Sequence, residues 1–459
     1  MELTSTSFKS KLLAEARSSL QLAVPLTAAQ LATAGINVIG TVIMGFLGTQ
    51  NLAAGALGAV PFSFLSVICT ATISAVGVNA AEAFGAKNTD KLSRILSSGL
   101  WLAAALSFPA MIFLWYSDTI LPFLGQEESN VLLAKNYIRA VMWGFPAAVG
   151  FSVLTDTASA VNRPFAITAI MIAELLLSVP ANYALAFGKW GFPDLGLAGI
   201  GWASTVILWL GFIAAACWLA LSPSFREYKL FSHLHQFDKV LFSEIFLLGA
   251  PTGIQLAGDM GMYASISLFM GILGTESLAA YTIVMRTSLI PITVVTGISY
   301  ATTMRVGQRM GEKAPLDAKR AVVFDIALST VFACIVALIF WLFAQPIVAI
   351  YLDVNNVDNV ETVAKAVSFF PLGGIYVIDF GVEFIAVSAL LGLKDTRVPM
   401  LINLVTTLGL GLAGSYLMGF TLGWGGVGLW WGLIGGLATA AVVLIWRLAL
   451  LFNNYLEEE

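Results

Sequence analysis

Twelve long apolar stretches nearly fill this chain of 459 residues. A helix needs roughly 20 apolar residues to cross the hydrocarbon core of a bilayer, and each stretch is at least about this long. The runs are continuous and lack the alternating polar face of a barrel strand, so we predict helices. They span residues 18–45, 53–81, 95–117, 132–160, 165–188, 195–220, 240–272, 279–307, 320–350, 362–391, 398–420 and 425–452. The sequence therefore predicts an all-α polytopic membrane protein with twelve transmembrane helices.

The composition excludes several classes of protein. Hydrophobic residues make up 58% of the chain and charged residues only 11%, against about 25% charged in an average soluble domain. A soluble enzyme, a nucleic-acid binder and a disordered protein are therefore excluded. The three cysteines, Cys69, Cys217 and Cys334, lie singly inside apolar stretches, which argues against a disulfide framework or a cysteine metal site. The polar N-terminal residues do not resemble a cleaved signal peptide, so we expect the first span to direct insertion.

The distribution of basic residues predicts the orientation in the membrane. If both termini are cytoplasmic, 18 of the 23 Lys and Arg residues fall at the inner side, including Arg305 at the end of the eighth span. Four fall outside, and Arg286 lies within a span. Cytoplasmic segments are enriched in Lys and Arg. We therefore expect a multi-pass protein of the inner (cytoplasmic) membrane with both termini in the cytoplasm.

The two halves of the chain resemble each other. At a constant offset of 226 residues, positions 25–54 match positions 251–280 at 10 of 30 places. The offset persists at Gly85-Ala86-Lys87 and Gly311-Glu312-Lys313. A register that persists over this distance indicates an internal repeat rather than a chance match of Gly- and Ala-rich helices. Six helices per half give both halves the same orientation, so we expect two six-helix bundles related by a pseudo-twofold axis along the membrane normal.

A polar segment separates the two predicted bundles. It carries SPSFREYKLFSHLHQFDK and is the most polar long segment of the chain. We therefore predict an N-terminal six-helix lobe over residues 1–220, a cytoplasmic linker over 221–243 and a C-terminal six-helix lobe over 244–459. His233 and His235 lie in the linker, where we interpret them as solvated loop histidines rather than as metal ligands.

Several motifs in these spans resemble the multidrug and toxic compound extrusion (MATE) family, in particular its NorM-like branch. They are AVPLTAAQ and GAPTGIQ at the starts of the first and seventh spans, MGFLGTQNLAA and MGILGTESLAA after them, RVGQRMGEK, LLGLKDTRVP and NYALAFGKWGFPDLGLAGIGWAS. The resemblance covers almost the whole chain. It implies the MATE fold, a V-shaped protein whose central cleft opens alternately to the two sides of the membrane.

The resemblance also implies a function. Family members exchange Na⁺ or H⁺ entering the cell for an organic, often cationic, compound leaving it. No GxxxxGK[ST] loop for ATP occurs in the sequence, so the energy must come from an ion gradient. We expect a small organic substrate, a monovalent cation and the lipid bilayer as partners, no nucleic acid, no organic cofactor and a monomeric protein.

Three acidic residues within the spans are the candidates for ion coupling. Asp259 lies in the seventh span, and Asp379 and Glu383 lie four residues apart in the tenth, on one helical face. An isolated charge at the bilayer centre costs at least ~2.5 kcal/mol. Their oxygens suit one Na⁺, and burial equally suits a proton site. The alternative is a structural network of buried hydrogen bonds.

The family resemblance supports the same residues. Asp259 matches the acidic cation ligand of helix 7 in the NorM-like branch, and Asp379 or Glu383 matches the acid of helix 10. Two features of the family are missing. The last span has no acid, and Gly40 stands where many members carry an aspartate in helix 1. Coupling through a helix-1 aspartate is therefore not supported.

Other ionisable residues occur near or within the spans. Glu174 lies in the middle of the fifth span, and we assign it to the substrate or to protons, with a structural hydrogen-bond role as the alternative. Asp156 lies near the inner end of the fourth span, where a structural ion pair with Arg163 is expected. We interpret Arg286 as a base buried in its span that pairs with a carboxylate, with Asp259 as the first choice.

Two further groups of residues are candidates by type and position. Polar, aromatic and Met side chains suit a cleft that binds organic cations of varied shape, although each of these types also occurs in ordinary helix packing. They are Asn182, Asn37, Gln30, Gln255, Tyr263, Tyr281, Met260, Met285 and Phe380. Prolines within the spans are hinge candidates, with tolerated kinks as the alternative. They are Pro25, Pro146, Pro251 and Pro371.

Two other kinds of function fit the sequence less well than export. A flippase for lipid-linked saccharides or lipids shares this broad architecture, but it should hold a diphosphate in a strongly cationic cleft, and only Arg286 lies within a span. An intramembrane enzyme would need a cluster such as His with Asp at depth, and no histidine lies in any span. We therefore predict a transporter rather than an enzyme.

Overall fold

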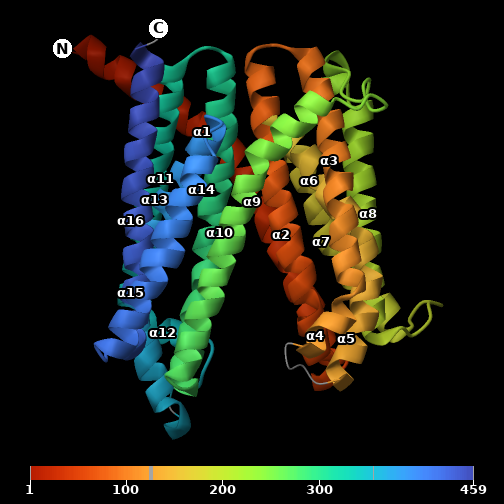
Figure 1. The fold of residues 1–459 in the computed structure, drawn as a ribbon, viewed down its shortest axis with the longest axis vertical. Coiled ribbons are helices and arrows are strands. Elements are labelled where there is room, and N and C mark those ends of the chain that lie inside the picture. The colour runs from red at the N-terminus through yellow and green to blue at the C-terminus, as the bar shows by residue number, and fades with distance from the viewer. Residues whose placement is uncertain (1, 124–127, 355, 458–459) are drawn as a thin grey trace. The chain divides into compact units, whose positions relative to one another are not determined.

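The computed structural model describes residues 2–123, 128–354 and 356–457 (Figure 1). Within these ranges the chain forms helices, turns and loops, and it contains no β-strand. Twelve of its helical segments are long and apolar enough to cross a membrane. They confirm the twelve predicted spans and the all-α fold class.

The helices of the first half are separated by short connections. In chain order they are α1 (Glu2–Phe46), α2 (Thr49–Gly85), α3 (Thr89–Trp115), α4 (Ser117–Phe123), α5 (Glu128–Val141), the 3₁₀ turn η1 (Met142–Gly144), α6 (Phe145–Ala160), α7 (Phe165–Phe187), α8 (Gly196–Leu221) and the 3₁₀ helix η2 (Pro223–Tyr228). The fourth span is thus built from α5, η1 and α6. Pro146 lies in the first turn of α6, directly after the 3₁₀ break, where its missing N–H costs nothing.

The second half has the same order of spans. Its elements are α9 (Lys239–Ile272), α10 (Thr275–Gly311), α11 (Pro315–Leu342), α12 (Ala344–Val348), the 3₁₀ turn η3 (Val357–Asn359), α13 (Val360–Gly392), α14 (Arg397–Asn403), η4 (Leu404–Gly411), α15 (Leu412–Tyr416), η5 (Leu417–Thr421) and α16 (Gly425–Glu457). The segments η4 and η5 are π-helical. The eleventh span therefore consists of α14, η4, α15 and η5.

One predicted span is too long. The sequence predicts a single span over 320–350, but α11 ends at Leu342 and the short helix α12 follows. Pro346 has no N–H to donate to the carbonyl group of Leu342, four residues earlier, so the helix cannot continue unbroken through it.

The backbone reproduces the internal repeat. Gly48 and Gly274, which are 226 residues apart, precede α2 and α10 with φ of 107° and 117°, a conformation essentially restricted to glycine. Lys87 and Lys313, at the same offset, follow the same helices with φ of 54° and 57°. The helices α2 and α10 both contain 37 residues. The two halves therefore use the same turns at the same places.

Packing divides the chain into two compact units, whose boundaries lie inside helices. Unit 1 contains Met1–Thr27 and Ile254–Glu459, and unit 2 contains Ala28–Gly253. This division differs from one placed at the polar linker 221–243, because the first part of α1 packs with the second half of the chain and the first part of α9 packs with the first half.

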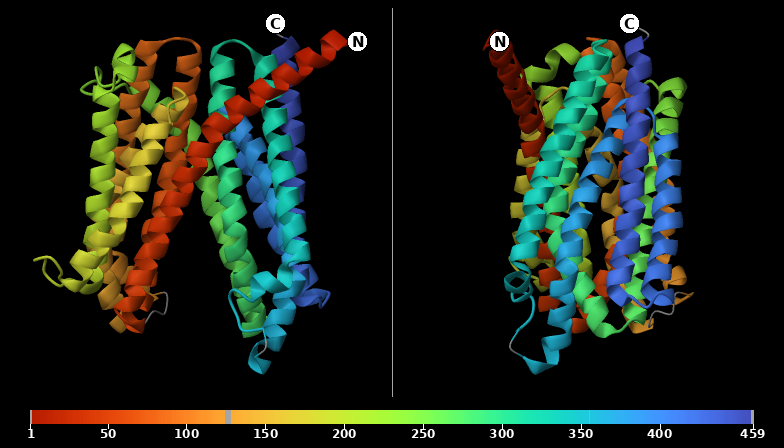
Figure 2. Two further views of the ribbon diagram at one scale, coloured as in Figure 1. Left: turned by 180° about the vertical axis from the view of Figure 1, so that it is seen from behind. Right: turned by 90° about the vertical axis from the view of Figure 1, so that its left-hand side faces the viewer.

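In unit 1, α13 is the central helix. It packs against α10, α11 and α16, and the π-helical eleventh span packs against α16. Trp430, Tyr376 and Phe370 are among the largest fully buried side chains of the structure and lie together in the apolar core of this unit. The N-terminal part of α1 joins the unit through Leu22 and Ala23, which pack against α10 and α13. Figure 2 shows this part of α1, in red, beside the helices of unit 1.

In unit 2, α2 packs against α3, α5 and α6, and α8 packs against α5, α6 and α7. The first part of α9 approaches α2 closely. A Cβ atom at Gly249 would overlap the carbonyl oxygen of Thr72, and one at Gly253 would press on the Thr72 hydroxyl. The absence of a side chain at these two positions therefore allows the backbones to touch.

Candidate functional site

The helix α13 carries two of the three candidate coupling residues one turn apart. Glu383 is buried and Asp379 is half-buried. Oε1 of Glu383 accepts a hydrogen bond from Nδ2 of Asn403 at the end of α14. Oδ2 of Asp379 is buried and has no hydrogen-bond partner among the described residues. One carboxylate of α13 thus has a fixed neutral donor, and the other has an oxygen left without one.

The helix α9 brings the third carboxylate to the same region of unit 1. Asp259 and Asp379 both lie close enough to Glu383 to interact with it electrostatically. Next to Asp259, the bare backbone of Gly258 packs against Leu404, the first residue of η4. Across the described parts of the chain, no three His, Cys, Asp or Glu side chains are arranged as a metal-ion cluster. In this conformation the three carboxylates are therefore neighbours but do not form a closed ligand triad.

A pair of residues of the eleventh span extends the network. Asn403 is 1% exposed, and its side-chain oxygen lies 2.6 Å from the Thr407 hydroxyl, which donates to it. Sequence reasoning misses both residues, because a neutral Asn or Thr in an apolar stretch carries no charge to mark it. The one available signal was the four-residue spacing of two polar side chains in NLVTT.

Aromatic side chains lie beside the carboxylates. The Tyr376 hydroxyl donates to that of Tyr263 at 3.1 Å, and Tyr263 also lies within electrostatic reach of Asp259 and Glu383. Phe380 is half-buried and stacks on Phe384 with ring centroids 5.0 Å apart. Met260 and Met285 are also half-buried. Half-buried aromatic and Met side chains near buried acids suit the binding of an organic cation.

Tyr281 takes a different position from the one expected. It is 4% exposed, belongs to the apolar core of unit 1 and packs against Trp430 with ring centroids 5.6 Å apart. In this structure it is a packing residue rather than a cleft residue. Its helical spacing in α10 turns it inward, toward α16.

The other polar cleft candidates differ in exposure. Asn37 is exposed, Gln30 is half-buried, and Gln255 is buried. Asn182 is buried in α7, where its Nδ2 donates to the carbonyl oxygen of Ser178 and its Oδ1 has no partner in the described chain.

Glu174 is buried in unit 2, in the middle of α7. A Cβ atom at Gly211 of α8 would overlap its carboxyl oxygen, so Gly211 provides the space that this carboxyl group occupies. No basic side chain forms an ion pair with Glu174 within the described residues. Unit 2 therefore also contains a buried acid without a built-in counter-ion.

The expected ion pair between Asp156 and Arg163 is absent. Asp156 is buried in α6, and its Oδ2 has no hydrogen-bond partner within the described ranges. Arg163 is exposed and donates to the Ser224 hydroxyl at 2.8 Å. The chain leaves α6 at Ala160 and turns through Asn162, whose φ is 61°. This turn directs Arg163 toward η2 rather than back to Asp156.

Arg286 does not form the expected buried pair with Asp259. It lies on an exposed face of α10 and makes no ion pair with a carboxylate of the described chain. The reason is helical geometry, since the buried positions Ile283, Val284 and Ser288 define the inner face of α10 and Arg286 falls between them on the outer face.

The buried base of α10 is instead Arg305. Its side chain is 3% exposed and donates two hydrogen bonds to Asp325 of α11, at 2.9 and 3.0 Å. Asp325 is fully buried and also accepts hydrogen bonds from Ser19 at 2.6 Å and from Thr302 at 2.9 Å. Glu15 of α1 forms a second ion pair with Arg305. This network fastens the N-terminal part of α1 to α10 and α11.

The sequence of this protein matches the MatE family model over residues 25–184 and 251–417. The chain belongs to the MATE family. One relative of this MATE protein is a probable multidrug resistance protein NorM of Synechocystis sp., 34% identical over 445 residues, which cover 97% of this chain and 96% of the relative. Another is a probable multidrug resistance protein NorM of Pseudomonas aeruginosa, 35% identical over 432 residues, which cover 94% and 88%.

Solved structures show the same fold. A MATE protein in the bent conformation superimposes with a TM-score of 0.88 at 17% identity, with 97% of both chains covered. The eukaryotic MATE transporter AtDTX14 gives 0.83 at 19% identity, with 96% of both chains covered. The predicted MATE fold is therefore confirmed. Membership of this family makes the protein a membrane transporter and not an enzyme.

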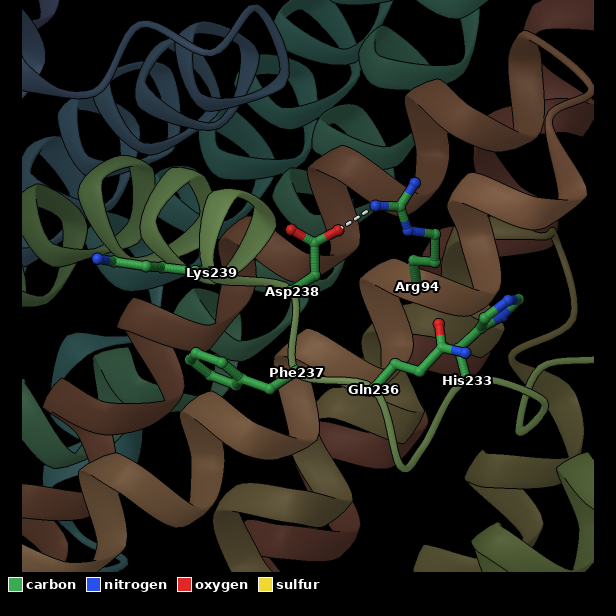
Figure 3. Close-up of a pocket in the computed structure, with 6 residues that line it drawn as sticks. All are labelled: Arg94, His233, Gln236, Phe237, Asp238 and Lys239. Carbon is green, nitrogen blue, oxygen red and sulfur yellow. Dashed lines mark hydrogen bonds and ion pairs between the residues drawn. The ribbon is translucent and has the colours of Figure 1, made fainter.

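The linker of this MATE transporter is fixed to α3 within unit 2. Ser97 donates to the carbonyl oxygen of His233 at 2.8 Å, and Arg94 forms an ion pair with Asp238. Figure 3 shows the pair at the edge of a cavity of about 230 Å³. The backbone N–H of Leu241, together with Arg94, holds the pKa of Asp238 below its ordinary value. The linker is thus a packed element with a defined start for α9.

The two linker histidines differ. His235 is exposed, as expected of a solvated loop histidine. His233 is half-buried, with its Nδ1 atom 3.1 Å from the Ser93 hydroxyl and its Nε2 atom 3.5 Å from the Asp90 carboxylate. His233 therefore packs against α3, because its own carbonyl oxygen accepts a hydrogen bond from Ser97 and the carbonyl oxygens of Lys229 and Leu230 accept from Ser93.

Proposed function

We propose that this MATE transporter is a cation-coupled antiporter that exports organic, cationic or amphipathic compounds by alternating access. The observation that carries the proposal is a group of acids in unit 1, of which Glu383 is buried and Asp259 and Asp379 are half-buried. Asp259 and Asp379 each lie near Glu383, and none of the three forms an ion pair with a base of the described chain. Buried negative charge without a built-in counter-ion is costly. A cation from solution, Na⁺ or H⁺, therefore completes the site.

The oxygens of the site suit such a cation. Carboxylate oxygens bind Na⁺ and also accept a proton in a dry environment. The hydroxyl groups of Tyr263 and Tyr376 lie beside them and add neutral polar groups. In the proposed mechanism, one conformation of the protein buries the carboxylates, and the bound cation neutralises their charge in that conformation. The cation shifts the equilibrium between conformations because it binds one of them more tightly than the other.

The energy of one coupled charge is sufficient for export. One elementary charge that moves through 100 mV yields about 2.3 kcal/mol. That free energy sustains roughly a 50-fold concentration gradient of the exported compound. A single coupled cation thus drives useful accumulation outside the cell.

The substrate class follows from the half-buried side chains and from the relatives. Met260, Met285 and Phe380 offer adaptable apolar and aromatic contacts, and Glu174 supplies a buried negative charge in the other unit. The names of the NorM relatives support drugs and toxins as substrates.

We further propose that Pro25 and Pro251 are hinges. The chain changes from one compact unit to the other between Thr27 and Ala28 in α1 and between Gly253 and Ile254 in α9. Each proline lies two residues before such a change. A proline frees the carbonyl group four residues earlier and lets a membrane helix bend. Pro146 and Pro371 are secondary candidates, since Pro146 follows a 3₁₀ break and the carbonyl oxygen of Pro371 accepts a hydrogen bond from Trp341.

The proposed orientation places both termini in the cytoplasm, with the protein acting as a monomer in the inner membrane. The start of α1 and the end of α16 lie at the same end of unit 1 (Figure 1). A reporter that is active only in the cytoplasm, fused after Glu459, should be active. A signal from a periplasmic reporter at the same site would contradict this orientation.

The central experiment is transport by the purified protein in liposomes. With an imposed Na⁺ or proton gradient, a fluorescent organic cation should move against its concentration gradient, and collapse of the ion gradient should stop it. Transport that depends on neither the Na⁺ gradient nor the proton gradient would overturn the proposal. Gradient-independent movement of a lipid-linked saccharide, without movement of the organic cation, would establish a flippase instead.

A further inference from the structure

We propose that Asn403, held by Thr407, is a positioning residue that fixes Glu383 in the geometry in which it takes up the coupling cation. The inference rests on the proposed antiport function and deepens it. It identifies the eleventh span, which carries no acid, as a part of the coupling site.

The hydrogen bonds run in one direction. The Thr407 hydroxyl donates to the side-chain oxygen of Asn403 and also lies against the backbone carbonyl oxygen of the same residue, and the amide nitrogen of Asn403 donates to Oε1 of Glu383. An amide group has one acceptor end and one donor end. An ionised carboxylate only accepts hydrogen bonds, so the donor end of the amide must face Glu383. The acceptor end then faces the Thr407 hydroxyl, which holds it there, so the amide is fixed at both ends.

The backbone around Asn403 is held on two sides. The bare Gly258 of α9 packs against Leu404, which follows Asn403. On the other side, Gly436 of α16 lies against Gly411 and the carbonyl oxygen of Thr406, with no room for a Cβ atom. The segment between them is the π-helix η4, and π-helical turns occur frequently at functional sites. Close packing thus places the segment that follows Asn403 against α9 and α16, while the amide itself reaches Glu383 of α13.

The chemistry of an amide suits this task better than that of a base. Arginine would donate the same hydrogen bond but would also neutralise Glu383, as Arg305 does for Asp325. Asn403 fixes one oxygen of Glu383 and leaves its charge uncompensated. The other oxygen, Oε2, has no hydrogen-bond partner in the described chain and remains available to a cation. The charge of Glu383 is thus positioned without being cancelled.

The test compares variants of these hydroxyl and amide groups in the reconstituted full-length transporter. The readout is the concentration of the driving cation that gives half-maximal transport, measured separately from the maximal rate and from the affinity for the organic cation. A residue with only a general structural role would lower the maximal rate and leave the half-saturating cation concentration unchanged. Measuring the half-saturating cation concentration separately from the maximal rate therefore distinguishes a positioning role from a general structural role.

We expect Asn403→Ala to raise the half-saturating cation concentration about tenfold or more, since it removes a hydrogen bond to a charged group. Thr407→Val keeps the shape of threonine and removes the hydroxyl, and it should raise this concentration about two- to tenfold. Thr407→Ser should restore the wild-type value. Affinity for the organic cation should not change in any of these variants. If Asn403→Ala does not fold, the Thr407→Val and Thr407→Ser variants test the inference by themselves.

Thr406→Val is the matched control. The Thr406 hydroxyl is also buried and lies one residue away, but it donates only to the backbone carbonyl oxygens of Ile402 and Asn403. It should leave the cation dependence unchanged. A wild-type cation dependence in Thr407→Val, or an equal shift in Thr406→Val, would overturn the inference. If Glu383→Gln itself retained gradient-driven transport, the proposed function would fail instead, and the two failures are thereby distinguished.

Discussion

Unit 1 contains two buried acids, Asp325 and Glu383, whose surroundings differ. Asp325 is fully buried and is surrounded by its partners, Arg305 and the hydroxyls of Ser19 and Thr302. Glu383 is almost equally buried, but its only hydrogen-bond partner among the described residues is the neutral amide of Asn403, and its charged neighbours there are the further acids Asp259 and Asp379.

On the proposed function, this difference distinguishes a structural acid, Asp325, from a coupling acid, Glu383. A carboxylate that carries its own arginine gains nothing from a cation in solution, because the charge is already balanced. A carboxylate among other carboxylates is balanced only when a cation arrives. Asp325 and Glu383 are similarly buried. Exposure alone therefore does not distinguish these two acids, whereas the presence or absence of a fixed counter-ion does.

The largest effect is expected at the uncompensated acids. Asp259→Asn keeps the shape and removes the charge, and it should reduce gradient-driven efflux to background, while expression and thermal stability stay close to wild type because a neutral amide is cheaper to bury than a charge. Adding Asp379→Asn should change little further, since the two residues belong to one site. Efflux in vesicles with an imposed gradient measures both.

Wild-type rates of gradient-driven efflux in Asp259→Asn would contradict this prediction. They would mean that Asp259, Asp379 and Glu383 do not couple transport. The vesicles should contain equal amounts of the variant and the wild-type protein, measured by quantitative blotting.

At the compensated acid the expected effect is on stability. Asp325→Asn leaves Arg305 buried with only Glu15 beside it, and removal of one partner of a buried ion pair costs ~3–5 kcal/mol. The thermal unfolding midpoint in detergent should fall by many degrees, while folded protein should keep the wild-type cation dependence. The double variant Asp325→Leu with Arg305→Met removes both charges and should recover much of the loss. A changed cation dependence in Asp325→Asn would erase the distinction between the two sites.

A smaller effect is expected in unit 2. Glu174 is a buried acid without a counter-ion, but it lies alone against Gly211 rather than among other acids. If it contacts cationic substrates, Glu174→Gln should reduce their transport several-fold, by about 1 kcal/mol of lost interaction, and should spare neutral compounds. Parallel efflux assays with a cationic and a neutral dye decide this. Equal loss for both dyes would indicate a structural role.

The smallest effect is expected at Arg286. Because it is exposed on α10 and makes no ion pair with a described carboxylate, Arg286→Gln should shift the half-saturating cation concentration less than about twofold, as for exposed charges in general. A cation titration of transport measures the shift. A large decrease in that concentration would mean that Arg286 competes with the cation for Asp259 after all.

Much of the fold follows from the sequence, because hydropathy and helix length alone determine which segments can cross a bilayer. The internal repeat can also be recognised in the sequence, because Gly48 and Gly274 must be glycine for conformational reasons. Asp259, Asp379 and Glu383 are predicted by one rule, the cost of a charge in an apolar helix. The same rule applies to Asp325, which lies within the predicted span 320–350 but is not among the predicted site residues.

Other parts of the site depend on tertiary packing. The partner of Glu383 is neutral and belongs to another helix, so no rule based on charge finds Asn403. The count of basic residues assigns Arg305 to the inner side, and only the packing of α1 and α11 around it shows that it is buried. Arg286 and Arg163 have plausible partners in the sequence, but the rotation of α10 and the turn at Asn162 direct them elsewhere.

The hydrogen bond between Ser19 and Asp325 has a consequence for the synthesis of the protein. It joins residues 306 positions apart, and the ribosome adds about 5–20 residues per second. The N-terminal part of α1 therefore emerges roughly 15–60 s before its partners on α10 and α11 exist. During that interval Leu22, Ala23 and Ser19 must be shielded by the insertion machinery, lipid or a transient neighbour. The N-terminal part of α1, although made early, is thus among the last segments to reach its final place, and a chain truncated before α10 cannot complete the packing of α1.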